Sequence, residues 1–528
     1  MSHTSKIFTT QKVDVPNRSG FDLSHENLLT MKVGTLTPIL CEEVLPNETY
    51  SLGHMTQVQL PPMATDFYGR VDFRMEAFFV PNRVVWGGWQ NFYTMPQNNP
   101  YGTPVVRPTQ VPSLLLSARD SAFAQPGGLL DYLGYRLNGS LTGDKVYTIK
   151  NSLPLFAYHK IYDDWYRNTK VQKPVYVRKL SPVSTDISSM PWQPATTSNA
   201  ISLTFNDGVA LGALRQRNYA KDYFTTAALY PQANGSVDGS KVVAPVNGAN
   251  SSFTIGQLRQ ANVLQRWLER NNIAGERYSD QIKATFGIMP SDAMLDRSLL
   301  LGSASFSIYN KSVFQTANNS DSTVSTTNPV GNTVGSKFGN SNGVGQDSLI
   351  DKFTSTEHGY IIVLASIVPH AQYSTGTRRH FQRSKVGDFA NPLLQGLGEQ
   401  AIMKSELIGT LADGTVDDEF GYQQQYSEYK YHDDEVHGLL KDGQSLSSFA
   451  LQRSFDSSVA LTTDFISIKT SDMDNVAAVS GDISQYGAWV DCFLNLRKVS
   501  PLSEYVIPTL GDLRDTHKED IPYRGRML

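Results

Sequence analysis

Five potential metal ligands lie within six residues of this sequence: His432, Asp433, Asp434, Glu435 and His437. Imidazole and carboxylate groups are ligands of zinc and calcium, so the cluster is a candidate divalent-cation site. The alternative is an acidic loop in contact with water, since the flanking residues 412–442 are also rich in Asp and Glu. We favour the loop, because the sequence positions no second group of ligands beside the cluster.

Basic residues interleaved with aromatic ones suggest a different chemistry. The densest positive run surrounds His380 and Phe381 and contains Arg378, Arg379, Arg383 and Lys385. In single-stranded nucleic-acid sites, cations neutralise phosphates and aromatic rings stack on bases. The run therefore predicts contact with single-stranded nucleic acid, and a protein surface held by ion pairs is the equal alternative. Arg524 and Arg526 form a weaker candidate of the same kind.

A similar mixture occurs earlier in the chain. Arg215, Arg217 and Lys221 lie among Tyr219 and Tyr223. For this segment we favour a surface face with ion pairs across an interface over a nucleic-acid site.

No catalytic constellation is recognisable. Ser341 lies between Gly339 and Gly343, the string of a nucleophile elbow. That motif needs a strand before it and a helix after it, whereas the string here lies in a low-complexity stretch, so we interpret the match as chance. We predict no enzymatic activity and no cofactor.

Composition restricts the class of protein. The 528 residues include 24 Phe, 25 Tyr and 6 Trp, and only 18% are charged, against about 25% in typical globular chains. Such a chain is not disordered as a whole, and its scarce charge suggests surfaces that face other protein. A net charge of −4 gives no whole-chain argument for binding nucleic acid. The two cysteines exclude a disulfide framework, and we expect folding in a reducing cytoplasm.

Strand signals dominate both ends of the sequence. Apolar residues alternate with charged ones from Val71 to Ala77, as in a strand buried on one face. The longest apolar run, Tyr360–Val368, predicts a strand buried on both faces and is too short to span a bilayer. Ile466 and Ile468 flank Ser467 and indicate another alternating strand.

Helical signals lie in the middle of the chain. Apolar residues from Leu155 to Trp165 share one helix face, and Pro154 suits the first turn. A second helix is expected from Thr254, with an apolar stripe made by Leu258, Ala261, Leu264 and Leu268, and a short helix follows from Tyr278 to Phe286. Strands, then helices, then strands indicate an antiparallel β core with helical excursions.

The chain reads as one domain with large insertions. We expect helix-containing insertions over about 82–300 and a flexible, exposed loop rich in Gly, Asn, Ser and Thr over 317–348.

Several strings, in order over roughly residues 20 to 430, resemble those of microvirus major capsid proteins, and of the gokushovirus-type branch in particular. They include Phe21-Asp22-Leu23-Ser24, Phe78-Phe79-Val80-Pro81-Asn82-Arg83 followed by Trp86 and Trp89, Asn218 to Thr225, Glu357-His358-Gly359 and Leu397-Gly398-Glu399-Gln400. Each string alone is weak, and their order is specific.

This resemblance implies a mainly β fold, an eight-stranded antiparallel jelly roll of the viral capsid type with helix-containing loops. It implies a homo-oligomeric T=1 icosahedral shell around a circular single-stranded DNA genome, with the basic run on the inner face. The partners implied are a small basic DNA-packaging protein, a pilot protein and a host surface receptor. The protein is then expected in the virion, assembled in the host bacterial cytoplasm without membrane insertion.

Other functions remain open on the sequence. One is a carbohydrate-binding β-sandwich protein or glycan-active enzyme, in which Asp417 and Asp433 would be recruited. Another is an attachment spike or fibre, which the helix after Thr254 argues against.

Overall fold

The computed structural model describes most of the chain. The described residues are 18–63, 67–94, 110–116, 126–135, 147–175, 205, 207–230, 255–274, 277–288, 291–292, 295–314, 337–409, 417–478, 481–502 and 504.

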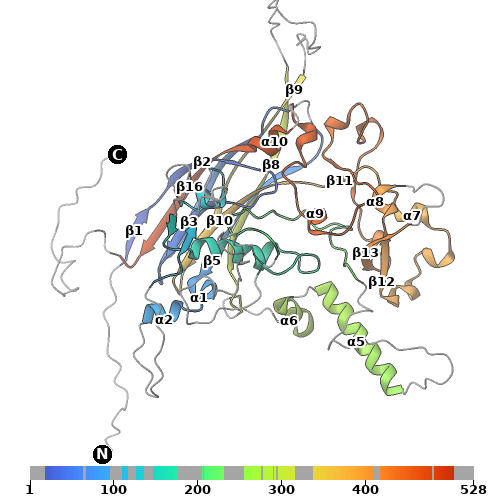
Figure 1. Cartoon of the computed structure of the whole chain (residues 1–528), viewed down its shortest axis with the longest axis horizontal. Coiled ribbons are helices and arrows are strands. Elements are labelled where there is room, and N and C mark those ends of the chain that lie inside the picture. Colours follow the sequence, from blue (N-terminus) through green and yellow to red (C-terminus); the bar gives the residue numbers. More distant parts are fainter. Residues whose placement is uncertain are drawn as a thin grey trace, which may run out of the picture.

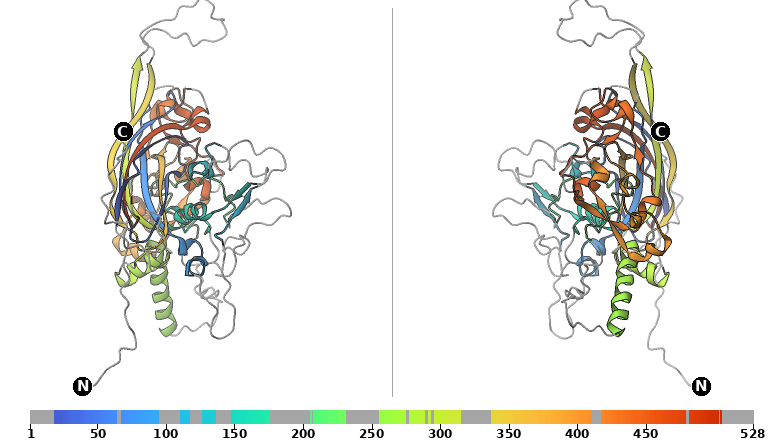
Figure 2. Two further views of the ribbon diagram at one scale, coloured as in Figure 1. Left: turned by 90° about the vertical axis from the view of Figure 1, so that its left-hand side faces the viewer. Right: turned by 90° about the vertical axis from the view of Figure 1, so that its right-hand side faces the viewer.

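An antiparallel sheet of nine strands dominates the fold (Figure 1). In sheet order the strands are β1 (Ser19–Asp22), β16 (Ala488–Ser500), β4 (Thr49–Gln59), β9 (Lys337–Thr354), β8 (Leu299–Phe314), β5 (Val71–Pro81), β10 (Gly359–Pro369) and β3 (Thr37–Val44), and β2 (His25–Met31) also pairs with β16. The sheet is strongly curled in the side views (Figure 2). Most neighbours are distant in the chain, as in Greek-key connections. The predicted mainly β fold is confirmed, and the curled sheet is consistent with a jelly roll, with nine strands where eight were expected.

The two N-terminal strands continue one another along one edge of β16. Asp22 lies opposite Arg497, and His25 lies opposite Leu494, so the register is unchanged across the break at Leu23. The nine strands therefore occupy eight positions in the sheet.

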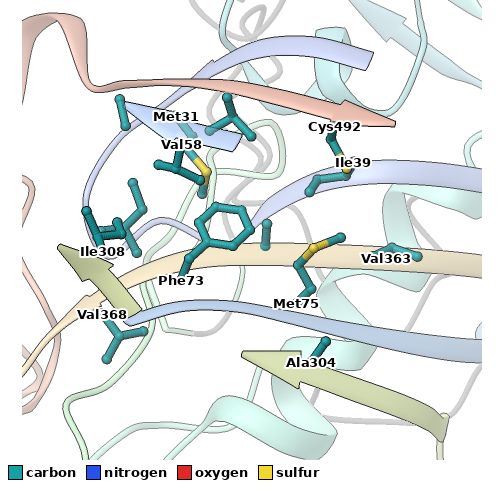
Figure 3. Close-up of a cluster of buried hydrophobic side chains, with 14 of the residues drawn as sticks. Met31, Ile39, Val58, Phe73, Met75, Ala304, Ile308, Val363, Val368 and Cys492 are labelled. Atoms are coloured by element: carbon teal, nitrogen blue, oxygen red, sulfur yellow. The ribbon is translucent and has the colours of Figure 1, made fainter. Parts of the chain in front are cut away.

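The main hydrophobic core fills the inside of the curl (Figure 3). Along β16 buried and exposed side chains alternate, because successive residues of a strand point to opposite faces. Figure 3 shows Phe73 and Met75 of β5 directed toward Val58 and Cys492 of strands across the curl. Burying a side chain such as Phe73 contributes about 1.5–3 kcal/mol, so this core fixes the curl.

Strand β10 is buried along its whole length, as predicted for Tyr360–Val368. Ile361 and Val363 face the main core, whereas Ile362 and Leu364 face a second core. Helix α4 (Leu153–Ile161) and the π-helix η2 (Tyr162–Tyr166) build that second core, which confirms the predicted helix.

The helices described between β5 and β8 are α1 (Asn82–Val85), α2 (Trp89–Thr94), α3 (Leu129–Tyr132), α4, α5 (Ile255–Ala274) and α6 (Tyr278–Phe286). A small hairpin, β6 (Leu114–Leu116) with β7 (Tyr147–Ile149), lies in the same part of the chain. Among the described residues, no helix is long and apolar enough to cross a membrane.

Between β10 and β16 the chain forms short elements around a third core that also includes Tyr223 and Phe224. The strands are β11 (Gln372–Tyr373), β12 (Glu399–Met403), β13 (Glu419–Gln424), β14 (Asp434–Glu435) and β15 (Gln452–Arg453), and the α-helices are α7 (Arg379–Gln382), α8 (Ser405–Ile408), α9 (Thr463–Ile466) and α10 (Asp482–Tyr486). Short 3-10 helices are η5 (Val386–Asp388), η6 (Pro392–Leu397), η7 (Ser427–Tyr429), η8 (Gly438–Leu440), η9 (Ser447–Phe449) and η10 (Asp474–Val476). Helix α9 replaces the strand predicted around Ser467, which forms only an isolated bridge with Asn218.

Strand β9 corrects the prediction of a loop over 317–348. Residues 337–348 form its first part, and the remainder of the predicted loop lies outside the described residues. The glycines there have a packing role: a Cβ at Gly345 would collide with the ring of Phe306 on β8, and one at Gly343 would press against Phe306 and Ile308. Ser341, in the nucleophile-elbow string, is buried inside this strand and has no strand–turn–helix setting.

Candidate nucleic-acid interface

A groove of about 520 Å³ brings together the two clusters singled out in the sequence. Its lining includes Arg378, Arg379, His432, Asp433 and His437. Strand β11 pairs in parallel with β14, and Tyr373 lies opposite Glu435. The basic residues that follow β11 therefore lie beside the acidic cluster around β14.

Arg378 is held by that cluster. Its Nε donates to Glu435 Oε1, and its Nη2 lies 3.3 Å from His432 Nδ1. The Glu435 carboxylate therefore compensates the charge of Arg378 within the same chain.

Arg379 and Arg383 are also paired with acidic residues. Arg379 Nη1 lies 3.2 Å from Glu406 Oε1, and its Nε lies 4.0 Å from Glu428 Oε1. Arg383 Nη2 donates to the same Glu428 oxygen at 2.7 Å and its guanidinium lies 4.3 Å from the centre of the Tyr429 ring. With 7% of its side chain exposed, Arg383 is held inside the fold.

Of the basic candidates, only Arg378 and Arg379 line the groove, and Arg383 does not. Lys385 is exposed, does not line the groove, and its backbone N–H donates to Asp388 at 2.8 Å. Arg524 and Arg526 lie outside the described residues.

Burial changes the electrostatics of the acidic wall. It raises the pKa of Asp433 to about 7, and the neighbouring Asp222 carboxylate acts in the same direction. Burial likewise raises the pKa of Glu406. The groove therefore gains negative charge as the pH rises toward 7.

The histidines of the cluster have protein partners. His432 contacts Arg378, and His437 Nε2 lies 3.1 Å from Glu435 Oε2, while Asp434 is exposed in β14. Within the described ranges, no three His, Cys, Asp or Glu side chains are arranged to hold a metal ion. Asp433 is not paired with Asp417 in the groove lining: Asp417 lies apart and accepts from the Ser405 N–H at 3.0 Å.

The earlier basic run is not the surface face that the sequence favoured, because Arg215 and Arg217 form ion pairs within the fold. Arg215 is 2% exposed and forms an ion pair with Asp207. Its guanidinium lies 4.9 Å from the centre of the Tyr162 ring. These contacts place Arg215 within the fold rather than at a ligand surface.

A larger groove was missed by sequence reasoning. It has a volume of about 1060 Å³ and follows the unpaired edges of β2 and β3, with the segment around α3 along one side. Trp489 and the carboxylates of Glu26 and Asp491 line it. Glu26 lies on β2, whereas Trp489 and Asp491 lie on β16 at the other end of the chain, so no local motif marks the groove.

Comparison with known proteins assigns the fold to a family. The family described as "Capsid protein (F protein)" matches residues 9–247 and 232–510. The chain belongs to this capsid protein family. Its relatives include capsid protein VP1 of Bdellovibrio phage phiMH2K, 26% identical over 93% of this chain and 95% of the relative. Capsid protein VP1 of Chlamydia phage 1 is also 26% identical, over 93% and 96%, and that of Spiroplasma virus 4 is 24% identical, over 93% and 95%.

These matches confirm the resemblance to gokushovirus-type microvirus capsid proteins. Membership of the capsid protein family assigns the chain a structural role in a virion and an oligomeric state.

Proposed function

We propose that this capsid protein is the major shell protein and that its copies form a small T=1 icosahedral particle around a circular single-stranded DNA genome. Enclosure is then a mechanical function, with no bond made or broken and no cofactor. Assembly takes place in the cytoplasm of the bacterial host.

The observation that carries self-assembly is an apolar band on the outer face of the sheet. Met55 of β4 lies opposite Phe493 of β16, and the two are 55% and 44% exposed. Trp489 of β16, Leu28 of β2 and Val344 of β9 are also exposed on this face. They surround Asp491 and Gln57, which lie in register between Leu28 and Val344. Exposed apolar side chains with a polar residue among them suit a protein contact. A closed shell covers one such face in every copy through interfaces of about 1,600 Å².

Electron microscopy of the expressed full-length chain tests this proposal. We expect closed particles of uniform diameter. A stable monomer that never forms particles would contradict it, and the absorbance ratio of nucleic acid to protein in purified particles reports whether DNA is enclosed.

We further propose that Arg378, Arg379, Arg383 and Lys385 face the enclosed DNA, together with Arg524 and Arg526. Arg378 and Arg379 are partly exposed, and each has five N–H donors, so an ion pair with a carboxylate leaves donors for phosphate. A chain with a net charge of −4 does not neutralise a genome, which supports a separate small basic packaging protein as partner. A pilot protein and a host surface receptor complete the proposed partners.

Lys385 gives the cleanest test of this face, because its exposed side chain has no described ion pair to lose. Particles of Lys385→Gln are compared with particles in which Arg378, Arg379 and Arg383 are also replaced by glutamine. We expect intact shells with stepwise lower DNA content, and unchanged DNA content in the fourfold variant would refute the assignment. A threefold Arg→Lys variant separates loss of charge from loss of the ion pairs.

A further inference from the structure

Helix α5 projects from the described fold with α6 beside it (Figures 1 and 2). At 1.5 Å per residue its 20 residues extend about 30 Å. Arg270 near its C-terminal end donates to the backbone oxygen of Ala284 in α6, which joins the two helices. Leu264 and Gln265 are half-buried, so α5 has a covered side and an uncovered one.

Three exposed arginines align along one side of α5, and the last of them, Arg270, also contacts α6. Arg259, Arg266 and Arg270 follow an i, i+7, i+11 spacing, which places them within about 20° of one line along a helix that turns about 100° per residue. Val263 lies one turn after Arg259, and Trp267 directly follows Arg266. Their side chains are 68% and 42% exposed. We call these five residues the arginine–tryptophan face.

This face carries charge that the described protein does not neutralise. Arg259 and Arg266 are exposed and form no ion pair with any carboxylate among the described residues. The arginines of the groove differ, since Arg378 and Arg379 each have a carboxylate partner. The arginine–tryptophan face is therefore the stronger anion-binding candidate of the two.

We propose that the arginine–tryptophan face of α5 binds single-stranded DNA, with its arginines on phosphates and Trp267 stacked on a base. The inference rests on the proposed enclosure of a single-stranded genome and names a contact for it. A cationic stripe along a helix is an electrostatic footprint for nucleic acid, and an exposed ring beside it supplies a stacking surface.

A second copy of the chain is the other possible occupant of this face. Arginine and tryptophan are common in protein interfaces as well, so residue type alone does not separate the two occupants. A second copy would have to place a carboxylate opposite each aligned arginine, whereas a phosphate backbone presents negative charge at every nucleotide. The absence of a carboxylate partner for Arg259 and Arg266 among the described residues therefore favours a polyanion over a protein surface.

Titration of unassembled full-length subunits with a fluorescein-labelled oligothymidylate tests the proposal. In Arg259→Gln/Arg266→Gln we expect the slope of log affinity against log salt to fall by about 1.4, the value for two phosphate contacts on a single strand. Glutamine preserves helix propensity, and circular dichroism checks that the fold is retained. In Trp267→Ala we expect affinity to fall roughly five- to 150-fold through lost stacking.

The matched control is Lys32→Gln/Lys352→Gln, which removes the same charge from exposed positions elsewhere. It should leave the salt slope near that of the unaltered chain. Equal slopes for the α5 variant and the unaltered chain overturn the proposal. So does an α5 variant that binds the oligonucleotide normally but fails to form particles, because the face is then a subunit contact.

Failure of this inference is distinguishable from failure of the proposed function. If the unaltered chain forms no closed particles, enclosure is refuted, while the oligonucleotide titration still reports on α5. If particles with DNA form and the titration shows no effect of α5, only the inference is refuted.

Discussion

Arg217 and Glu76 form a two-bond ion pair inside the fold, with Nη1–Oε2 and Nη2–Oε1 distances of 2.8 Å each. The Tyr166 hydroxyl donates to the same Glu76 Oε2 at 2.8 Å, and the guanidinium lies 5.2 Å from the centre of the Tyr166 ring. The pair ties strand β5 to the segment between η2 and α5. An arginine that the sequence places in a basic–aromatic run thus serves to join two parts of the fold.

Replacing one member of this pair should destabilise the subunit strongly. In Glu76→Gln the Arg217 charge stays buried without its partner, and we expect a loss of about 3–5 kcal/mol. Urea unfolding of unassembled subunits measures it. The control is Asp418→Asn, which breaks an exposed ion pair with Lys404 and should cost less than about 1 kcal/mol. Similar losses of unfolding free energy in both variants would show that the buried pair contributes no more to stability than the exposed pair.

A side chain at Gly345 of β9 should destabilise the subunit. In Gly345→Ala the new Cβ collides with the Phe306 ring, and we expect a loss of about 1–3 kcal/mol in unfolding free energy. Adding Phe306→Leu should restore part of that loss. Gly20→Ala is the control, since a Cβ there meets nothing within 4 Å. A neutral Gly345→Ala would mean that β9 does not pack on Phe306 in solution.

Asp433 should make stability depend on pH. Its pKa of about 7 in the folded chain lies above the ordinary value of 3.8, so the folded state holds the proton more tightly. The protonated Asp433 therefore adds to the free energy of unfolding in full below about pH 4, and this contribution is lost as the pH rises through about 7. Each unit of difference between the folded and unfolded pKa corresponds to about 1.4 kcal/mol. Melting temperatures of subunits measured from pH 4 to 8 should fall more steeply for the unaltered chain than for Asp433→Asn. If the melting temperatures of the two proteins fall in parallel with pH, Asp433 is not the source of the pH dependence.

A charge in the apolar band should stop assembly without unfolding the subunit. Phe493 is exposed, so Phe493→Glu leaves the core intact and places a charge where a neighbour is expected to pack. We expect normal melting of the subunit and no closed particles by electron microscopy. Asp491→Asn, on the same face of β16, serves as control and should assemble. Normal particles from Phe493→Glu would place the subunit contacts elsewhere.

Local sequence patterns correctly predict those helices and strands whose buried face shows in the spacing of apolar residues within the element itself. The alternation from Val71 to Ala77 gave β5, and the apolar run after Tyr360 gave β10. The helix after Pro154 was predicted for the same reason, because one turn of a helix brings its apolar residues onto one face.

Local patterns do not predict which distant segments of the chain pair with one another. Arg378 is neutralised by Glu435 only because β11 pairs in parallel with β14, and no local spacing encodes that contact. Glycine in β9 was interpreted as a loop signal, although the aromatic ring that requires it lies on the neighbouring strand. On α5 the apolar stripe predicts the helix. The i, i+7, i+11 spacing of its arginines could also have been recognised from the sequence alone.

Strand β16 follows every other described strand in the chain, yet it lies between β4 and the β1–β2 edge. While the protein emerges from the ribosome, these N-terminal strands have no partner to join them until Ala488 and the residues after it have been made. An incomplete nascent chain therefore lacks the finished outer face on which neighbours would pack. We therefore expect unfinished chains to be excluded from assembly by the order of synthesis.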